Sequence, residues 1–242
     1  FQCRRTVDTA GGLATEPVEY SGVDMAVPNG KTPVLLLHGF PEWSSIYVDL
    51  MRHLHNEGFY AVACNQRGYS PNARPPNKLD YHYDRLREDV FATAEKFFPG
   101  VKFHLIAHDH GSLLGWYATR AQESNNKLLS YTSLSVPHPD AFTAGVSDGT
   151  GVTSEKQKLA SQYFDIFVLD DSANKAIPGV GSLYDMMGLG RDVGFDTGFD
   201  TAEEFQRALW WFNGAAGQLP GGLGSGAGVL SLPSVNSAVS KL

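Results

Sequence analysis

The sequence predicts an α/β protein with a mostly parallel, doubly wound sheet and an inserted helical cap. Short, continuous apolar runs at residues 33–37, 59–64 and 102–107 suit strands that are buried on both faces of a parallel sheet. Segments with helical spacing of apolar residues separate these runs, and strands that alternate with helices form parallel sheets through right-handed crossovers. At 242 residues, the chain is long enough for one such domain with a small cap.

The elements of the first half follow one another in this alternation. After the first strand we expect a helix at 44–57, a strand at 59–64, a loop at 65–78, a helix at 83–98, a strand at 102–107, a helix at 111–122 and a strand at 128–136. The first helix ends before Gly58, and Pro99-Gly100 close the second, because these residue types end helices. The loop is assigned from its content of Pro, Asn and Gly.

From about residue 139 the pattern changes, and this change predicts the domain organisation. Helical segments at 154–169 and 201–212 have no clear strand between them. We therefore expect a core at 1–139 and a helical cap at 140–213. Residues 214–242 are rich in Gly and Ser and poor in large apolar groups, which predicts a linker or tail.

Composition excludes several classes of partner. The formal net charge is −7 and no run of Lys or Arg offers a surface for phosphates, so nucleic acid is not expected. No apolar run approaches the roughly 20 residues that cross a bilayer, so no membrane span is expected. The only two cysteines, Cys3 and Cys64, do not suggest a disulfide framework or a metal site, and Cys64 is expected to be a buried thiol.

We expect a cytoplasmic location, with one reservation at the end of the chain. Residues Ser240-Lys241-Leu242 spell a peroxisomal address. This address applies only if Leu242 is the natural C-terminus, and a chance match in a tail rich in Ser and Leu is the alternative.

The stretch Ala107-His108-Asp109-His110-Gly111 has the layout of a nucleophile elbow, because it joins an apolar strand to an apolar helix through a turn with small residues. The common form of this turn is G-x-S-x-G. Here Asp109 takes the place of the serine, and a carboxylate at this tip attacks carbon to form an ester. Asp109 is therefore the candidate nucleophile; an aspartate that only caps the helix is the alternative.

The loop His38-Gly39-Phe40-Pro41 follows the first strand and is expected to complete the site. In this arrangement the loop donates one backbone N–H to an oxyanion hole, and the residue after the nucleophile donates another. We assign these donors to Phe40 and His110. The Phe40–Pro41 bond is a candidate cis peptide, and a plain strand-to-helix turn is the alternative.

Four segments together resemble the epoxide-hydrolase branch of the α/β-hydrolase superfamily. They are Leu37-His38-Gly39-Phe40-Pro41-Glu42-Trp43, Asn65-Gln66-Arg67-Gly68-Tyr69-Ser70, the His108-Asp109 elbow and Ser135-Val136-Pro137-His138-Pro139. The resemblance implies an α/β-hydrolase fold, attack of the aspartate on an epoxide carbon, and cleavage of the resulting alkyl-enzyme ester by a histidine-activated water. It implies a small-molecule substrate and neither a metal nor an organic cofactor. Related dehalogenases share the aspartate nucleophile.

The chain departs from the family's pattern after the nucleophile and at the two tyrosines that act as acids on the epoxide oxygen. His110 stands where the family has Trp. Ala160 and Phe212 stand where the family has the two tyrosines that act as proton donors, and Phe cannot donate a proton. Tyr163 lies one helical turn beyond Ala160 and is the candidate substitute.

The family's last strands, its acid and its base histidine are not found either. All eight histidines lie at or before His138. We therefore expect the N-terminal part of a longer hydrolase, with a natural short form that lacks turnover as the alternative.

Three other functions stay open from the sequence. A dehalogenase would need halide donors, for which Trp43, Trp210 and Trp211 are candidates. A truncated relative could act as a binding module, and a serine hydrolase would use Ser112. For all enzymatic readings, the expected substrate-binding residues are Trp43, Tyr163, Trp211 and Phe212, which would line an apolar pocket. The sequence leaves the oligomeric state open.

Overall fold

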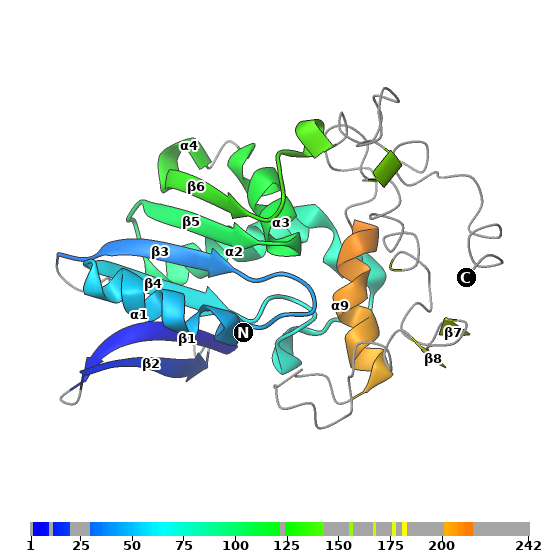
Figure 1. Ribbon diagram of the computed structural model, residues 1–242, viewed down its shortest axis with the longest axis horizontal. Coiled ribbons are helices and arrows are strands. Elements are labelled where there is room, and N and C mark those ends of the chain that lie inside the picture. The colour runs from blue at the N-terminus through cyan, green and yellow to red at the C-terminus, as the bar shows by residue number, and fades with distance from the viewer. Residues whose placement is uncertain are drawn as a thin grey trace. The chain divides into compact units, whose positions relative to one another are not determined.

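The computed structural model describes residues 2–9, 12–19, 30–121, 124–142, 155–156, 167, 176–177, 181–182 and 201–214 (Figure 1). The chain divides into two compact units. The first comprises residues 1–73 and 84–136, and the second comprises residues 74–83 and 137–242. The expected tail beyond residue 214 lies outside the described residues, and so do Ala160 and Tyr163. The boundaries expected for core, cap and tail stay predictions.

The first unit is built on a six-stranded sheet with the order β2-β1-β4-β3-β5-β6. The strands are β1 (Gln2–Thr9), β2 (Gly12–Glu19), β3 (Thr32–Leu37), β4 (Phe59–Cys64), β5 (Phe103–His108) and β6 (Leu128–Leu134). Strands β4, β3, β5 and β6 pair with one another in parallel, whereas β1 is antiparallel to both β2 and β4. The expected mostly parallel sheet is confirmed, and the four expected strands are found within two residues of their expected ends.

The antiparallel hairpin of β1 and β2 was not foreseen. Its strands lack the continuous apolar runs of the other four, and β2 contains Pro17, a residue that sheets tolerate at edges. β2 is indeed the edge strand of the sheet.

The helices follow the expected alternation. The first begins as a 3-10 turn, η1 (Ser44–Tyr47), and continues as α1 (Val48–Asn56), after which Gly58 adopts a φ of 88°. The others of the first unit are η2 (Pro71–Ala73), α2 (Tyr83–Phe97), which begins at the last residue of the second unit, α3 (His110–Thr119) and α4 (Ser124–Lys127). Within the described ranges, every helix falls short of the length and hydropathy that a membrane span requires.

Helix α1 lies on one face of the sheet, and helices α2 and α3 lie on the other (Figure 1). The cluster beneath α1 consists of Val34, Leu36, Tyr47, Met51, Ala61 and Ala63. Leu35, Val62 and Leu105 alternate with the residues of this cluster and are at most 1% exposed, so they fill the opposite face. This two-sided burial explains the continuous apolar runs, because neither face of these strands meets water.

The second unit contains η3 (Lys78–Tyr81), β7 (Ala176–Ile177), β8 (Gly181–Ser182) and α9 (Ala202–Gly214). Helix α9 confirms the expected helix at 201–212, whereas the expected helix at 154–169 falls mostly outside the described residues. Arg74 forms an ion pair with Glu204, and Arg207 donates to the carbonyl oxygen of Arg74 over 2.7 Å. The rings of Tyr81 and Trp210 pack edge to face at 5.3 Å. Residues 74–83 therefore fold with α9.

Cys3 and Cys64 form a disulfide, so the expectation of a buried free thiol at Cys64 is wrong. The two residues lie directly opposite each other where β1 pairs with β4. They are separated by 61 residues, and only the pairing of these two strands brings them together. Spacing along the chain carries no signal for such a contact.

We predict that Gly115→Ala destabilises the first unit by about 1–3 kcal/mol. A methyl group at Gly115 would lie 2.5 Å from the ring of Tyr131. That ring is held at both ends, since Tyr131 donates to the carbonyl of Ser112 over 2.7 Å and packs against Trp116 at 4.9 Å. At an exposed helix position, Gly→Ala would stabilise the helix by about 1 kcal/mol. The sign of the change in the free energy of unfolding, measured with urea, therefore shows whether the methyl group clashes.

The double variant Gly115→Ala/Tyr131→Ala serves as the control for this clash. We expect it to lose less stability than the sum of the two single variants, because removing the ring removes the clash. Additive losses would show that the ring does not limit position 115.

Candidate active site

Asp109 sits on a strained turn between β5 and α3. Its φ of 51° and ψ of −125° fall in a region that residues with a side chain rarely adopt. Such strain persists only where the surroundings hold it, and it occurs preferentially at functional sites. The half-buried carboxylate thus leaves the sheet at the carboxyl end of β5, the edge at which open α/β sheets bind ligands.

Two glycines allow the elbow and the loop after β3 to approach each other. A methyl group at Gly39 would collide with Cβ of Asp109 and lie 2.6 Å from its Oδ1. A methyl group at Gly111 would lie 2.5 Å from the carbonyl oxygen of Leu37. The small residues of both motifs are therefore required by close contact between two segments that are distant in the sequence.

The carboxylate of Asp109 does not cap helix α3, which excludes the alternative that it serves only as an N-cap. Its Oδ1 instead accepts a hydrogen bond of 2.8 Å from the backbone N–H of Phe40. The first turn of α3 uses the backbone carbonyl of Asp109, to which Ser112 N–H donates over 2.8 Å. The side chain is thus held from the opposite loop and keeps its second oxygen, Oδ2, for other partners.

The loop that carries this amide, residues 38–43, is called here the Phe40 loop. Its Phe40–Pro41 peptide bond is cis, as the sequence suggested. Glu42 Oε2 accepts from Gly39 N–H and from His108 Nδ1, each over 2.9 Å. Glu42 therefore ties the loop to the residue before Asp109. No role was foreseen for Glu42 or His108, since only the fold brings the two together.

His38 anchors the start of the Phe40 loop. Gln66 N–H donates to His38 Nε2 over 3.0 Å, so the proton of the neutral ring lies on Nδ1, which donates to the Gly39 carbonyl over 2.9 Å. The side-chain amide of Gln66 also donates to the His38 carbonyl over 2.6 Å. Burial lowers the pKa of His38 to about 4, against weaker opposing effects of the Gly39 carbonyl and the Asp109 charge, so the ring is neutral at pH 7.

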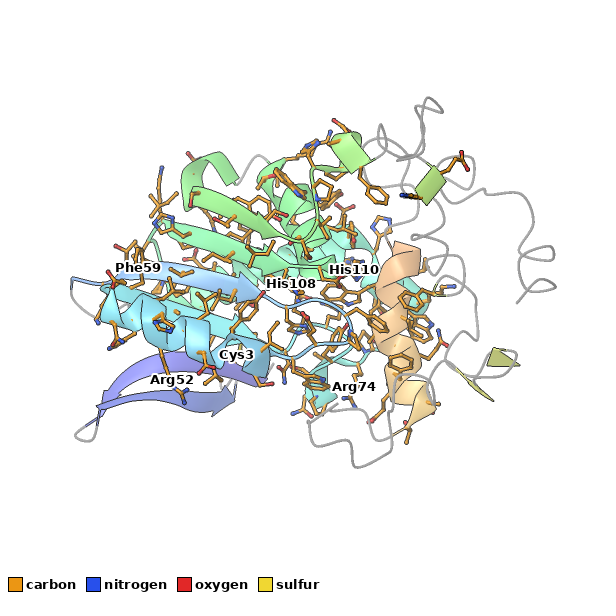
Figure 2. The ribbon with its side chains drawn as sticks, in the orientation of Figure 1. Cys3, Arg52, Phe59, Arg74, His108 and His110 are labelled. Carbon is orange, nitrogen blue, oxygen red and sulfur yellow. A yellow bond between two sulfur atoms is a disulfide. The ribbon has the colours of Figure 1, made fainter. Side chains whose placement is uncertain are left out.

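His110 is the first residue of α3 and is also buried. Burial lowers its pKa to about 4, while the neighbouring Asp109 charge acts in the opposite direction, so this ring is neutral at pH 7 as well. Figure 2 shows His108 and His110 at the carboxyl end of β5, on either side of the elbow. The assignment of the His110 amide as a second oxyanion donor stays a prediction.

Ser112 is not placed to act as a nucleophile, so the serine-hydrolase alternative is wrong. Its side chain is fully buried. Its hydroxyl lies 2.7 Å from the carbonyl of Ala107 and 3.0 Å from that of Leu134, both within reach of its single proton. This serine ties α3 to strands β5 and β6.

The expected substrate-binding residues are only partly described. Trp43 belongs to the first unit, is 7% exposed and packs edge to face on Tyr69 at 5.8 Å. Trp211 lies in α9 of the second unit and is 1% exposed, and Phe212 follows it in the same helix. Their role stays a prediction. Among the described residues, no group of three or more His, Cys, Asp or Glu side chains is arranged to hold a metal ion.

The first unit also reveals how the motif after β4 contributes. Residues 65–70, called here the Asn65 loop, are hydrogen-bonded to the Phe40 loop through Gln66 and His38. Asn65 Oδ1 accepts from Ser44 N–H over 2.9 Å, and Ser70 donates to the Asn65 carbonyl over 2.6 Å. Arg67 forms a two-pronged ion pair with Asp89 of α2, at 2.6 and 2.7 Å. The sequence analysis singled out residues 65–70 as a motif. The structure shows that these residues bind the Phe40 loop and the residue that follows it.

Comparison with known proteins finds the family model of the α/β hydrolase fold over residues 32–193. The AB hydrolase superfamily protein YfhM of Bacillus subtilis is 32% identical over 57% of this chain and 46% of its own length. Human epoxide hydrolase 4 is 31% identical over 57% of this chain and 36% of its own length. The chain thus spans less than half the length of the curated relatives it matches.

Solved structures show the same fold. One from a study of novel epoxide hydrolases from hot-environment metagenomes has a TM-score of 0.61 and 21% identity, covering 86% of this chain and 68% of its own. The epoxide hydrolase of Bacillus megaterium has a TM-score of 0.53 and 22% identity, over 78% of this chain and 66% of its own.

We predict that the buried His38 lowers the free energy of unfolding as the pH falls. The unfolded ring titrates near 6.5 and the folded ring near 4, so unfolding takes up a proton between these values. The unfolding free energy should therefore drop by about 3 kcal/mol as the pH falls from 6.5 to 4 on account of this residue. His38→Gln should be less stable at pH 7.5 but show a shallower decline with acid, measured by urea unfolding across this range.

His53→Gln is the matched control, because His53 is exposed on α1. It should keep the wild-type slope, and the buried His110 contributes to the slope in wild type and in both variants. Equal slopes for wild type and His38→Gln would refute a neutral, buried His38.

Proposed function

The chain belongs to the α/β hydrolase fold family, and we propose that it is the nucleophile-bearing part of an epoxide-hydrolase-like enzyme that acts on a small apolar substrate. One observation carries the proposal: a strained aspartate at the elbow whose Oδ1 is bound by the amide of Phe40 at 2.8 Å. Since the amide occupies Oδ1, Oδ2 is the oxygen that attacks. A carboxylate held this way is oriented before the substrate arrives.

The proposed reaction has two steps. In the first, Asp109 Oδ2 bonds to an epoxide carbon, the carbon–oxygen bond of the ring breaks, and the released oxygen takes a proton from an acid. In the second, water adds to the carbonyl carbon of the ester, its proton passes to a base, and collapse of the intermediate releases the diol and restores the carboxylate. The amides of Phe40 and His110 would stabilise the oxyanion of the second step.

The second step needs a base, and the buried His38 near Asp109 is not available for that role. His38 and His110 are neutral at pH 7, but His38 is committed to Gln66 and the Gly39 carbonyl. No histidine follows His138 in this sequence. We therefore propose that this chain forms the ester and hydrolyses it slowly at best. A dehalogenase would use the same attack with halide as the leaving group.

For the location of the protein, the Cys3–Cys64 disulfide supports an oxidising compartment in place of the cytoplasm that the sequence led us to expect. Disulfides persist in such compartments and are rare in the cytosol, where thiols are kept reduced.

We predict a covalent adduct on Asp109 when the chain is treated with styrene oxide. The mass should rise by that of one epoxide, and peptide mapping should place the adduct on Asp109. Asp109→Asn should lose it, because an amide is a poor nucleophile. Asp49→Asn is the matched control, since that carboxylate is 86% exposed and lies on α1, and it should label like wild type.

An iodoalkane in place of the epoxide separates the two enzymatic readings. Labelling by both probes indicates a general alkyl-ester former, and iodide release with turnover indicates a dehalogenase. A folded sample that labels with neither probe would falsify the nucleophile assignment and leave the binding-module reading.

We predict that Gly39→Ala slows adduct formation by roughly 10²-fold, because a nucleophile that is displaced by about 1 Å loses the orientation that the attack requires. The new methyl group would collide with Asp109 and separate the carboxylate from the Phe40 amide. The rate is followed by intact-mass spectrometry under identical conditions. Gly58→Ala provides the control for general loss of stability, because the φ of 88° at this position strains an alanine although its methyl group would meet nothing within 4 Å. Equal rates for both variants would contradict a role of the Phe40 amide.

A further inference from the structure

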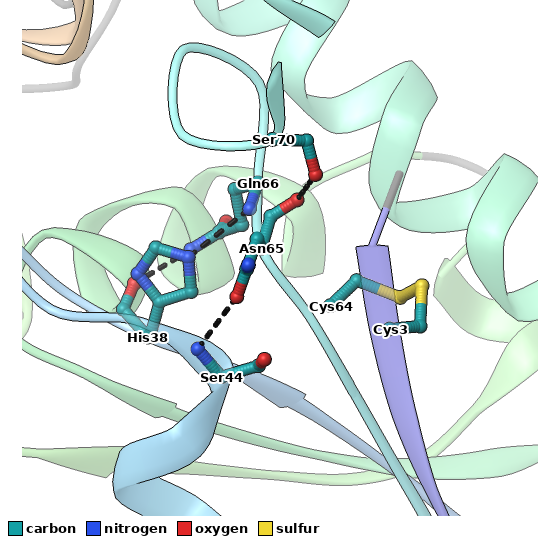
Figure 3. The surroundings of a disulfide bond; sticks show 7 residues. All are labelled: Cys3, His38, Ser44, Cys64, Asn65, Gln66 and Ser70. Carbon is teal, nitrogen blue, oxygen red and sulfur yellow. Dashed lines mark hydrogen bonds between the residues drawn. A yellow bond between two sulfur atoms is a disulfide. The ribbon is translucent and has the colours of Figure 1, made fainter. Parts of the chain in front are cut away.

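We propose that the Cys3–Cys64 disulfide is a positioning element for the Phe40 loop. The disulfide lies at the end of β4, beside the residues that hold this loop (Figure 3). The inference rests on the proposed function, in which the amide of Phe40 orients the carboxylate of Asp109.

The two residues that follow Cys64 hold the Phe40 loop at both of its ends. Gln66 binds His38, the first residue of the loop, through its backbone N–H at 3.0 Å and its side-chain amide at 2.6 Å. Asn65 Oδ1 accepts from the N–H of Ser44, directly after the loop, at 2.9 Å. The position of Phe40 therefore depends on where β4 delivers Asn65 and Gln66.

The end of β4 depends on the disulfide because the neighbouring ladder stops short of it. The pairing of β4 with β3 ends at Ala63, opposite Leu36. Cys64 is paired on the other side, with Cys3 of β1, and that ladder comprises three residue pairs. The disulfide joins the end pair of the β1–β4 ladder. It therefore fixes Cys64 at a point of β4 that the pairing with β3 no longer reaches.

The Asn65 loop is also held by contacts of its later residues, so the disulfide contributes only to how the start of the loop is held. Ser70 donates to the Asn65 carbonyl at 2.6 Å, and Arg67 pairs with Asp89. These contacts lie after Asn65, whereas the disulfide lies before it. Asn65 and Gln66 are thus held from both sides. Both cysteines are buried, at 2% and 6% exposure, so a reductant reaches the bond only when the folded chain opens.

Breaking the bond should loosen these contacts in a local and measurable way. Reduction by a dithiol cleaves the sulfur–sulfur bond, adds one electron and one proton to each sulfur, and closes the dithiol to its cyclic disulfide. The double variant Cys3→Ser/Cys64→Ser removes the bond without a reductant. Met51→Ala is the matched control, since Met51 is fully buried in α1, its truncation weakens the core, and the cluster in which it packs includes no residue of either loop.

The test compares amide hydrogen exchange with the rate of Asp109 labelling by styrene oxide in the full chain. In the double variant, we expect exchange at Phe40 and Gln66 to accelerate about tenfold more than at Leu36 and Leu105. Labelling should slow by about tenfold after correction for the folded fraction, and reoxidation of reduced wild type should restore its rate. Met51→Ala should accelerate exchange evenly at these four amides.

Two results would overturn the proposal. One is unchanged exchange at Phe40 and Gln66 in the double variant; the other is an even acceleration like that of Met51→Ala, which would make the disulfide a general stabiliser. If wild type does not label at Asp109, the proposed function fails, but the exchange comparison still decides whether the disulfide positions the loop.

Discussion

The hydrogen bond from the Phe40 amide to Asp109 is the contact on which the site depends. It spans 69 residues of sequence, and the parallel pairing of β3 with β5 makes it available. Because Leu37 lies opposite Ala107, the two strands release their following loops side by side at the same edge of the sheet. Gly39 and Gly111 then leave the space that the approach requires.

The surroundings of Asp109 hold its carboxylate with neutral dipoles. Burial keeps His38 and His110 uncharged at pH 7, and the Phe40 amide supplies a fixed donor in place of a mobile cation. In the proposed reaction, such a preorganised amide costs no reorganisation and leaves Oδ2 as the attacking oxygen. Glu42, bound to Gly39 and His108, keeps the donor loop in register with the elbow.

Support for this arrangement extends outward in layers. The Phe40 loop rests on the Asn65 loop, the Asn65 loop continues from β4, and the disulfide fixes β4 to the N-terminal hairpin. The contacts between the N-terminal hairpin and Asp109 are thus few, and all of them are hydrogen bonds or covalent bonds between named residues.

The sequence by itself determined the alternating strands and helices, the elbow at Asp109 and the facing loop at Phe40, because periodicity and turn chemistry are local properties of the chain. Only the tertiary structure decided that Ser112 is buried, that Glu42 meets His108 across 66 residues, and that Cys3 bonds to Cys64 across 61. These contacts follow from strand order and register. The polar sequence of β1 and β2 does not indicate the order or the register of these strands. The pairing of β1 with β4 could therefore be known only from the folded chain.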